Sequence, residues 1–302
     1  MGVRPEVNIR RLDTCAFDDA LRLWNEGFAG YAFDMTLSLD AYLARLREGG
    51  LSPELSLAVF VDGRPAGFVL NGVREVSGRR MAWNGGTGVA PEFRRGGLGK
   101  LLIEAALEVY REQGAQAATL EALANNEAAI ALYKSLGYEI TDRLLLLERR
   151  GRLAADSFGD GGAYAVARVG AHEVARLDFY DAAAPWQTQW QSVRLGGEAL
   201  VVSDAAGVVA YALYKKTVDA DGNLREVTLY QCAHAPGCAD PEAAVARALR
   251  EAYAPANADC RRVAHNLSES GELLLGSLTA AGFEVFAEQV HMRIDLRVRP
   301  MA

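Results

Sequence analysis

The chain repeats itself weakly at a spacing of about 145 residues, and this repeat limits the folds open to it. Residues 63–70, GRPAGFVL, resemble residues 207–214, GVVAYALY. The segment YKSLGYEI with Gly137 is matched by LTAAGFEV with Gly282, and VAPEF is matched by AHAPGC. A period of this size is that of a domain rather than of a solenoid repeat, so the sequence predicts two copies of one domain.

Length and local composition place the two copies along the chain. At 302 residues the chain is long enough for two domains of ordinary size. Gly, Asp, Ala and Ser replace the hydrophobic pattern over residues 151–162, which predicts a linker there. The expected domains are therefore residues 1–150 and residues 163–302.

Charge and composition exclude several classes of protein. The net charge is -7, so no basic excess exists to neutralise a nucleic-acid backbone, whereas a cationic or amine partner is weakly favoured. The N-terminus shows no apolar signal core, and the leucine run at 144–147 is too short to cross a bilayer. The four cysteines are typical of thiols in a reducing compartment. We expect a cytoplasmic protein, monomeric or homodimeric, with neither nucleic acid nor membrane as a partner.

Hydrophobic spacing in the first half predicts alternating strands and helices. Asp62-Gly63 between two apolar runs indicates a β-hairpin. The fold class expected is α/β, with two tandem domains that are each a mostly antiparallel twisted sheet flanked by helices. Strands are predicted near 7–13, 55–61, 64–73, 81–89, 117–123 and 138–148, and helices near 18–28, 39–47, 98–113 and 126–136.

The segment PEFRRGGLGKLL, residues 91–102, places glycines and arginines directly before a predicted helix. A Walker loop fails because Leu101 stands where Ser or Thr is needed. A dinucleotide fingerprint fails because Leu102 replaces its third glycine.

An Arg-x-x-Gly-x-Gly pattern is met by Arg94, Gly97 and Gly99. Glycines there let successive N–H groups converge on an anion at the positive end of the helix, and the arginines can add charged hydrogen bonds. The alternative is a glycine-rich turn with solvated arginines.

With GVAPEF before the loop and LEALANNEAAIALYKSLGYE after it, residues 81–140 resemble the GNAT superfamily of N-acyltransferases. The rest of the first half resembles the family only in its order of elements. The resemblance implies acetyl transfer from acetyl-CoA to an amine. It assigns coenzyme A binding to Val89, Arg94, Arg95, Gly96, Gly97, Leu98, Gly99, Lys100 and Asn126. For Asn126 the alternative is a plain helix N-cap.

Amide formation needs a neutral amine and a proton for the departing thiolate. Residues 1–150 contain no histidine, so a base from this half is a carboxylate, acting directly or through water. The resemblance points to Glu121 as that base and to Tyr133 as the acid. The alternatives are a solvated or salt-bridged strand glutamate and a core aromatic. Cys15 shows no activating partner in sequence, so direct attack in a ternary complex is expected.

Acceptor recognition is predicted for WNEGFAGYAFD, which lies where GNAT enzymes place the segment over the acceptor site. An aromatic and acidic slot for an amine is one interpretation, and an amphipathic helix packed on the core is the other. The residues concerned are Trp24, Glu26, Phe28, Tyr31 and Asp34.

The second copy lacks the residues that define the first. At the repeat spacing, Leu278 stands at the position equivalent to Tyr133, so the second copy lacks the residue expected to act as the acid. The loop residues Arg94, Gly97 and Gly99 become Ala239, Glu242 and Ala244, with Asp240 added. Carboxylates at a helix start repel a pyrophosphate, so this copy is predicted to be a degenerate GNAT domain. In mycothiol synthases, which are tandem GNAT relatives, the second domain carries out the transfer. Here the intact motif is in the first domain, which argues against assigning the chain to that type.

Two further interpretations concern the second half. Cysteines and histidines there, including Cys232, His234 and Cys238, fit no paired CxxC spacing, so no metal is expected. His172 and His291 are isolated; one of the four histidines could reach the first domain as a base, but sequence does not identify it. The alternative function is a coenzyme A-binding regulatory or scaffold protein without turnover.

Overall fold

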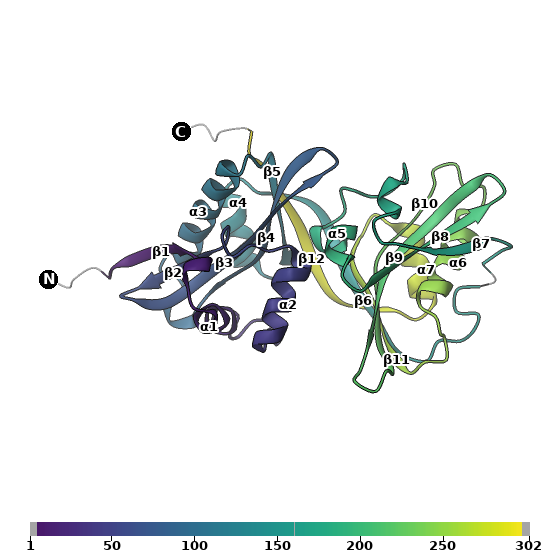
Figure 1. Ribbon diagram of the computed structural model, residues 1–302, viewed down its shortest axis with the longest axis horizontal. Helices are drawn as coiled ribbons and strands as arrows, with labels where there is room; N and C mark the ends of the chain where they lie inside the picture. Colours follow the sequence, from purple (N-terminus) through teal and green to yellow (C-terminus); the bar gives the residue numbers. More distant parts are fainter. Residues whose placement is uncertain (1–4, 160, 298–302) are drawn as a thin grey trace. The chain divides into compact units, whose positions relative to one another are not determined.

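A computed structural model describes residues 5–159 and 161–297, which pack as two compact units (Figure 1). The described part of the first unit is 5–122, 126–141 and 291–297; that of the second is 123–125, 142–159 and 161–290. The domain limits at 150 and 163 stay predictions, as does the linker at 151–162, whose position 160 lies outside the described residues.

In the first unit, strands run in the order β1-β2-β3-β4-β5, followed by the C-terminal end of β12 and the start of β6. The strands are β1 (Val7–Arg11), β2 (Leu57–Val61), β3 (Arg64–Val76), β4 (Arg79–Val89), β5 (Ala117–Leu123), β6 (Glu139–Gly151) and β12 (Glu284–Asp295). The helices are α1 (Phe17–Gly27), α2 (Leu39–Gly49), α3 (Leu98–Glu112) and α4 (Glu127–Ser135).

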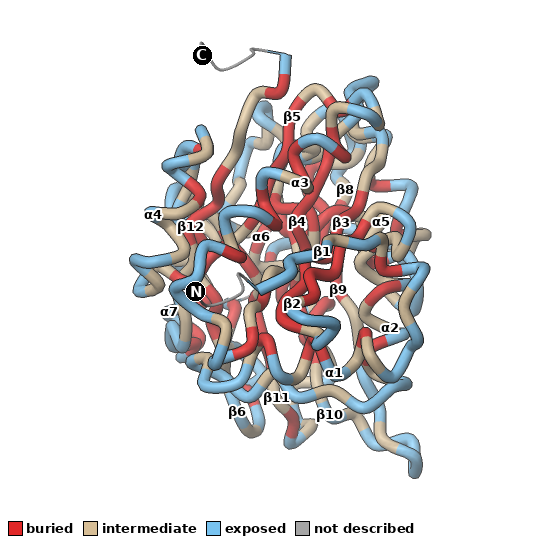
Figure 2. Tube along the Cα trace, turned by 90° about the vertical axis from the view of Figure 1, so that its left-hand side faces the viewer, coloured by how far each residue is buried: buried red, intermediate tan, exposed pale blue. Residues whose placement is uncertain are grey.

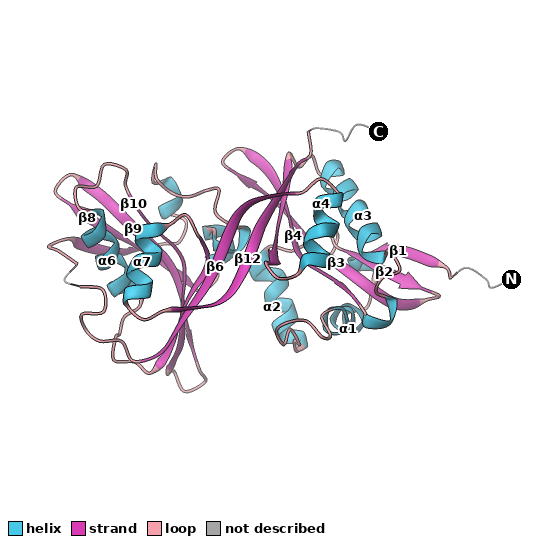
Figure 3. Cartoon of the chain, turned by 180° about the vertical axis from the view of Figure 1, so that it is seen from behind, coloured by secondary structure: helices cyan, strands magenta, loops and turns pink. Residues whose placement is uncertain are grey.

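Neighbouring residues of β3 show that helices cover both faces of this sheet (Figure 3). The Phe68 ring packs on Trp24 of α1, with ring centroids 5.5 Å apart. A Cβ added at Gly67 would lie 3.3 Å from Leu102 of α3. Successive strand residues point to opposite faces, so α1 and α3 lie on opposite sides of β3. The strands between them are correspondingly buried, and β2, β3 and β4 are largely red in Figure 2.

The hairpin predicted at Asp62-Gly63 is present between β2 and β3. Both residues have positive φ, 49° and 75°, and the register pairs Val61 with Arg64. Two positive φ values characterise the type I′ turn, whose twist matches that of the flanking strands. Local turn chemistry was therefore sufficient to predict this connection.

The second unit has a similar succession of elements, with a helix of 4 residues, α5 (Trp190–Val193), where the first unit has α1 and α2. Its strands run β6-β11-β10-β9-β8-β7, with β6 contributing its C-terminal part. The strands are β7 (Ala165–Val169), β8 (Gly197–Asp204), β9 (Gly207–Val218), β10 (Leu224–His234) and β11 (Cys260–Ser268), and the helices are α5 (Trp190–Val193), α6 (Pro241–Ala252) and α7 (Glu272–Ala280).

Each unit has one parallel strand pair at the corresponding place. β4 pairs with β5 from Met81–Ala117 to Asn84–Leu120, and β10 pairs with β11 over 226–229 and 261–264. The other strand pairs with a described register are antiparallel. The α/β fold class predicted from the repeat, two tandem domains with mostly antiparallel sheets, is confirmed.

The last strands of the two units come from opposite halves of the sequence. In the first unit β12 lies next to β5, where the Leu296 N–H donates to the Gln116 carbonyl at 2.9 Å. In the second unit β11 pairs with Leu144–Gly151 of β6. Residues 291–297 therefore belong to the first unit. None of the helices in the described ranges has the length and apolar character that crossing a membrane requires.

Candidate active site

The loop before α3 has the backbone conformation that an anion site needs. Arg95 and Gly97 both have positive φ, 64° and 83°, and Gly97 is the N-cap of α3. No side chain caps this helix, and its first turn contains no acidic residue. A Cβ built at Gly97 meets no atom within 4 Å, so the space beside it is open. This end of α3 fits a phosphate group.

The Arg94 guanidinium points to backbone carbonyls rather than into this loop. It donates to the oxygens of Val89 at 2.9 Å, Ala29 at 2.6 Å and Gly27 at 3.2 Å. The side chain therefore ties the loop to the end of α1 and occupies the Val89 carbonyl. The expectation that both arginines add charged hydrogen bonds to an anion is corrected for Arg94, because its donors face these carbonyls. Lys100 forms an exposed ion pair with Glu104 at 3.7 Å.

A β-bulge interrupts β4 next to the loop. The register with β3 skips Gly85, and the Asn84 side chain satisfies the released backbone by accepting from Gly86 N–H at 3.0 Å. Its Nδ2 donates to the Thr87 hydroxyl at 2.9 Å. The described pairing with β5 stops at Asn84, so the backbone from Gly85 to Val89 diverges from that strand.

Tyr133 on α4 lies against this bulge. Burial raises the pKa of its phenol, and side-chain hydrogen bonding to Thr87 and Asn84 partly opposes the shift. Only 8% of the residue is exposed. The phenol therefore stays protonated at neutral pH and is held at the strand that leads into the glycine loop.

Two other predicted residues join Tyr133. Asn126 is the N-cap of α4 and accepts from the Ala129 N–H at 3.2 Å. Tyr31 hydrogen-bonds to the Asn126 side chain and interacts electrostatically with Tyr133, while burial raises its own pKa. The structure thus brings Tyr31, from the predicted acceptor segment, to two residues of the motif around α4.

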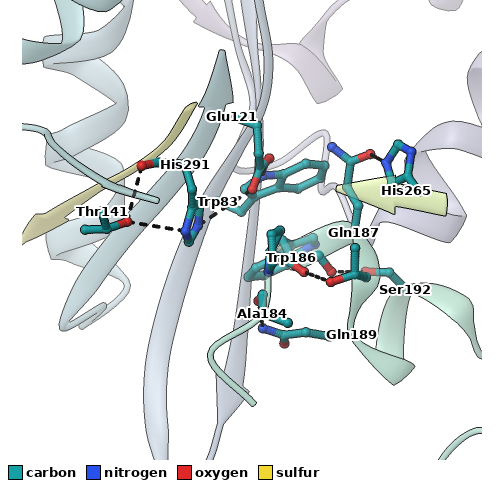
Figure 4. Close-up of polar contacts among 12 residues, drawn as sticks. Trp83, Glu121, Thr141, Ala184, Trp186, Gln187, Gln189, Ser192, His265 and His291 are labelled. Atoms are coloured by element: carbon teal, nitrogen blue, oxygen red, sulfur yellow. Dashed lines mark hydrogen bonds and ion pairs between the residues drawn. The ribbon is translucent and has the colours of Figure 1, made fainter. Parts of the chain in front are cut away.

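Glu121 on β5 lies beside the Trp83 indole (Figure 4). Its side chain is 3% exposed, and the Trp83 indole N–H donates to Oε2 at 2.8 Å. Arg45 on α2 interacts with it electrostatically: burial lowers the Arg45 pKa to about 10, and the Glu121 charge opposes that shift. Arg45 also donates to the Gly85 carbonyl at 2.8 Å. Glu121 is therefore not a solvated strand glutamate, whereas the salt-bridged alternative stays open, since Arg45 and His291 lie beside it.

His291 on β12 is the residue that sequence reasoning missed. Its Nε2 lies 3.8 Å from Glu121 Oε1, and its Nδ1 lies 3.4 Å from the Thr141 hydroxyl, which donates to the His291 carbonyl at 3.2 Å (Figure 4). The other three histidines belong to the second unit. No local signal identifies His291, because only the pairing of β12 beside β5 brings it to Glu121.

The predicted acceptor residues are not assembled as one slot. Trp24 is 1% exposed and donates to the Met35 carbonyl, so it is a core residue and that prediction is corrected. Phe28 and Tyr31 form an edge-to-face pair with centroids 5.3 Å apart. The two carboxylates are exposed: Asp34 accepts from the Thr36 N–H, and Glu26 lies on the solvent side of α1.

In the described residues of the second unit, the corresponding parts carry no equivalent site. Asp240 caps α6 by accepting from Ala243 N–H at 3.0 Å, and Pro241 has no N–H to offer. Leu278 is fully buried in the core. The helix start is therefore closed to a phosphate, in line with the predicted degeneracy. Within the described residues, no group of three or more His, Cys, Asp or Glu side chains could hold a metal.

Residues 18–138 match the family model described as Acetyltransferase (GNAT) family, and this part of the chain belongs to that family. A [Ribosomal protein bS18]-alanine N-acetyltransferase of Salmonella typhimurium is 38% identical over 84 residues, which are 28% of this chain and 54% of the relative. A mycothiol acetyltransferase of Paenarthrobacter aurescens is 39% identical over 98 residues, 32% of this chain and 30% of the relative. The chain thus spans about half or less of these relatives.

The tandem fold also has a solved counterpart. A tandem GNAT protein from the clavulanic acid biosynthesis pathway superposes with a TM-score of 0.64 at 15% identity, covering 99% of this chain and all of that protein. At this identity the likeness concerns the fold alone. It supports the arrangement of two GNAT-like domains that the internal repeat predicted.

Proposed function

We propose that the first unit transfers an acetyl group from acetyl-CoA to an amine of a small molecule or peptide, by direct attack in a ternary complex. One observation carries the proposal: the Tyr133 phenol is held by Thr87 and Asn84 on the strand that leads into the open loop of α3. A proton donor and an anion site therefore adjoin each other, as transfer from a coenzyme A thioester requires. Membership of residues 18–138 in the GNAT family supports the same chemistry.

Acetyl-CoA would supply an activated acetyl thioester, and the loop from Arg95 to Lys100 would hold its pyrophosphate. Gly97 provides the left-handed backbone there and leaves the space beside it open. Beyond the β4 bulge the backbone is no longer paired with β5. It would face the rest of the acetyl-CoA molecule there. Val89 would contribute through its N–H, since Arg94 holds its carbonyl.

Glu121 and Tyr133 divide the proton transfers. An alkyl ammonium has a pKa near ~10.4, so Glu121 must remove a proton before the amine attacks. At 3% exposure, its carboxylate would receive that proton through water. As the C–N bond forms and the C–S bond breaks, the nitrogen gives up a second proton to solvent and Tyr133 protonates the sulfur. Glu121 then gives its proton to solvent and solvent restores the phenol, so one net proton is released.

The test begins with thermal unfolding with and without acetyl-CoA. Wild type, Gly97→Glu and Gly78→Glu are compared, because both glycines have positive φ in open space but only Gly97 is in the loop. At ~100 times its dissociation constant the ligand should add about 2.7 kcal/mol of stability. We expect the shift in wild type and Gly78→Glu and its loss in Gly97→Glu.

Thiol release is then measured with a panel of amines: a peptide with an N-terminal alanine, spermidine and an aminoglycoside. Turnover with any of them supports the proposed transfer. Binding of acetyl-CoA without thiol release from any amine would favour a coenzyme A-binding regulatory protein. The absence of a thermal shift in wild type would contradict both.

A further inference from the structure

We propose that His291 is a positioning residue for Glu121, and that its protonation state decides whether Oε1 of Glu121 can accept a proton. The inference rests on the proposed function of Glu121 as the base. His291 reaches the first unit only as part of β12, so the C-terminal strand would regulate the chemistry of the N-terminal unit.

The two carboxylate oxygens have different surroundings. Trp83 donates to Oε2 at 2.8 Å, which fixes the orientation of the carboxylate. Oε1 faces His291 Nε2 at 3.8 Å, a distance too long for a hydrogen bond but short enough for strong electrostatic interaction. His291 therefore acts on Oε1 through its charge, and Oε1 is the oxygen suited to accept a proton.

The Thr141 hydroxyl indicates which nitrogen of His291 faces the carboxylate without a proton. Its hydrogen is directed to the His291 carbonyl at 3.2 Å, so its oxygen is the acceptor for Nδ1–H at 3.4 Å. In the neutral imidazole the proton is then on Nδ1, and Nε2 is bare. Protonation adds a hydrogen to Nε2, opposite Oε1.

The consequence for catalysis depends on pH. A neutral imidazole leaves Glu121 able to take the acceptor's proton, whereas an imidazolium pairs with Oε1 and lowers its basicity. Among the described contacts, Glu121 on β5 faces the imidazole, Arg45 on α2 adds positive charge near the carboxylate, and Thr141 on β6 contributes a hydroxyl. Protonation of the imidazole is favoured as pH falls, so the effect belongs to the acidic side of the pH profile.

The first experiment follows the histidine Cε1–H signals by NMR as a function of pH. The chain has only four histidines, and the His291→Gln spectrum identifies the fourth signal. In Glu121→Gln we expect the His291 midpoint to move to lower pH, by about one unit, because the neighbouring negative charge is gone. The three other midpoints serve as internal controls. An unmoved His291 midpoint would overturn the coupling, whether or not the protein is an acetyltransferase.

The second experiment compares kcat/KM of wild type, His291→Gln and His172→Gln from pH 5.5 to 8, with the amine of the panel that is turned over fastest. The titration of the amine affects all three proteins equally and cancels in their ratio. We expect the wild-type to His291→Gln ratio of kcat/KM to fall several-fold between pH 8 and pH 5.5, because the imidazole gains its proton as pH decreases. A ratio independent of pH would mean that His291 is merely structural and would overturn the proposal.

For the His172→Gln control, the ratio of wild-type to variant kcat/KM should stay near one over the whole pH range, since His172 belongs to the second unit. If His291→Gln fails to fold, Thr141→Val replaces it. Removing the hydroxyl releases Nδ1, so the His291 midpoint should change in this variant. A midpoint identical to wild type would contradict the role assigned to the hydroxyl. If no amine is turned over, the proposed function fails, and the NMR result still decides the coupling.

Discussion

The imidazole Nε2 of His291 lies 3.8 Å from the carboxylate Oε1 of Glu121, although the two residues come from opposite halves of the chain. Glu121 is in the segment that matches the GNAT family, and His291 is on the final strand. The placement follows from the sheet order, in which β12 lies beside β5. The first unit therefore depends on the C-terminal end of the chain for its sheet and for its one described histidine.

Replacing Glu121 with Gln should lower kcat by about 10²-fold, because a neutral amide can accept the Trp83 hydrogen bond but cannot take a proton from the acceptor. The KM for acetyl-CoA should stay unchanged. Steady-state thiol release measures both, with Glu108→Gln on the exposed face of α3 as control. A kcat within twofold of wild type would remove Glu121 from the mechanism.

Tyr133→Phe should slow turnover by about 10²-fold while leaving the dissociation constant of acetyl-CoA unchanged, since the lost hydroxyl is the proton donor for the thiolate. Tyr138→Phe is the matched control. Its ring is also buried and lies 5.9 Å from the Tyr133 ring between centroids, and its hydroxyl has no hydrogen-bond partner in the described part of the chain. Equal turnover in the two variants would show that the Tyr133 hydroxyl has no chemical role.

Arg94→Ala should lower the free energy of unfolding by about 1 kcal/mol, because three carbonyls lose a charged donor at the protein surface. It should also raise the KM for acetyl-CoA by releasing the loop from the end of α1. Arg95→Ala removes the same charge from an exposed side chain and should change stability by less than about 0.5 kcal/mol. Urea unfolding and saturation kinetics measure the two effects. Equal changes in the free energy of unfolding and in KM in both variants would mean that the positive charge, and not the hydrogen bonds to the three carbonyls, causes the effects.

Alkaline pH should destabilise the protein through its buried phenols. Burial raises the pKa of Tyr42 to about 12, from a value of 10.0, and it also raises that of Tyr133. The folded state therefore holds these protons more tightly than the unfolded state. The stabilising contribution is complete below pH 10 and is lost as pH rises from 10 through 12.

The measurement is urea unfolding at pH 8, 10.5 and 11.5. We expect the free energy of unfolding to decline above pH 10, and to decline less in Tyr42→Phe, because this variant has one fewer buried phenol to ionise. The comparison variant is Tyr164→Phe, which removes a half-buried phenol of the second unit whose hydroxyl donates to the Asp240 carbonyl and whose pKa is also raised, so its slope should lie between those of wild type and Tyr42→Phe. Identical slopes in wild type and Tyr42→Phe would mean that Tyr42 does not differ in pKa between the two states.

Features that depend on local backbone conformation could be predicted from the sequence. Asp62 and Gly63 form the expected turn, and Gly97 has the positive φ that an anion loop needs. In the second copy Asp240 caps its own helix, as a carboxylate at a helix start does. Each of these requirements concerns a few consecutive residues, so the residue types themselves carry the information.

The direction of a side chain could not be predicted in the same way. Trp24 has the spacing of a helix face but lies inside the core, and Arg94 has the position of an anion ligand but binds the carbonyls of Ala29 and Gly27. Both outcomes depend on what packs across from the residue. That partner lies elsewhere in the sequence.

The sequence by itself determined the tandem GNAT architecture, the glycine loop and the candidate acid and base, because these are carried by a repeat and by short motifs. Only the tertiary structure decided that Glu121 is buried beside Trp83 and that His291 faces it. The reason is that strand order within a sheet is set by long-range pairing, in which β12 adds to β5. An isolated histidine on a strand carries no record of which strand will be its neighbour.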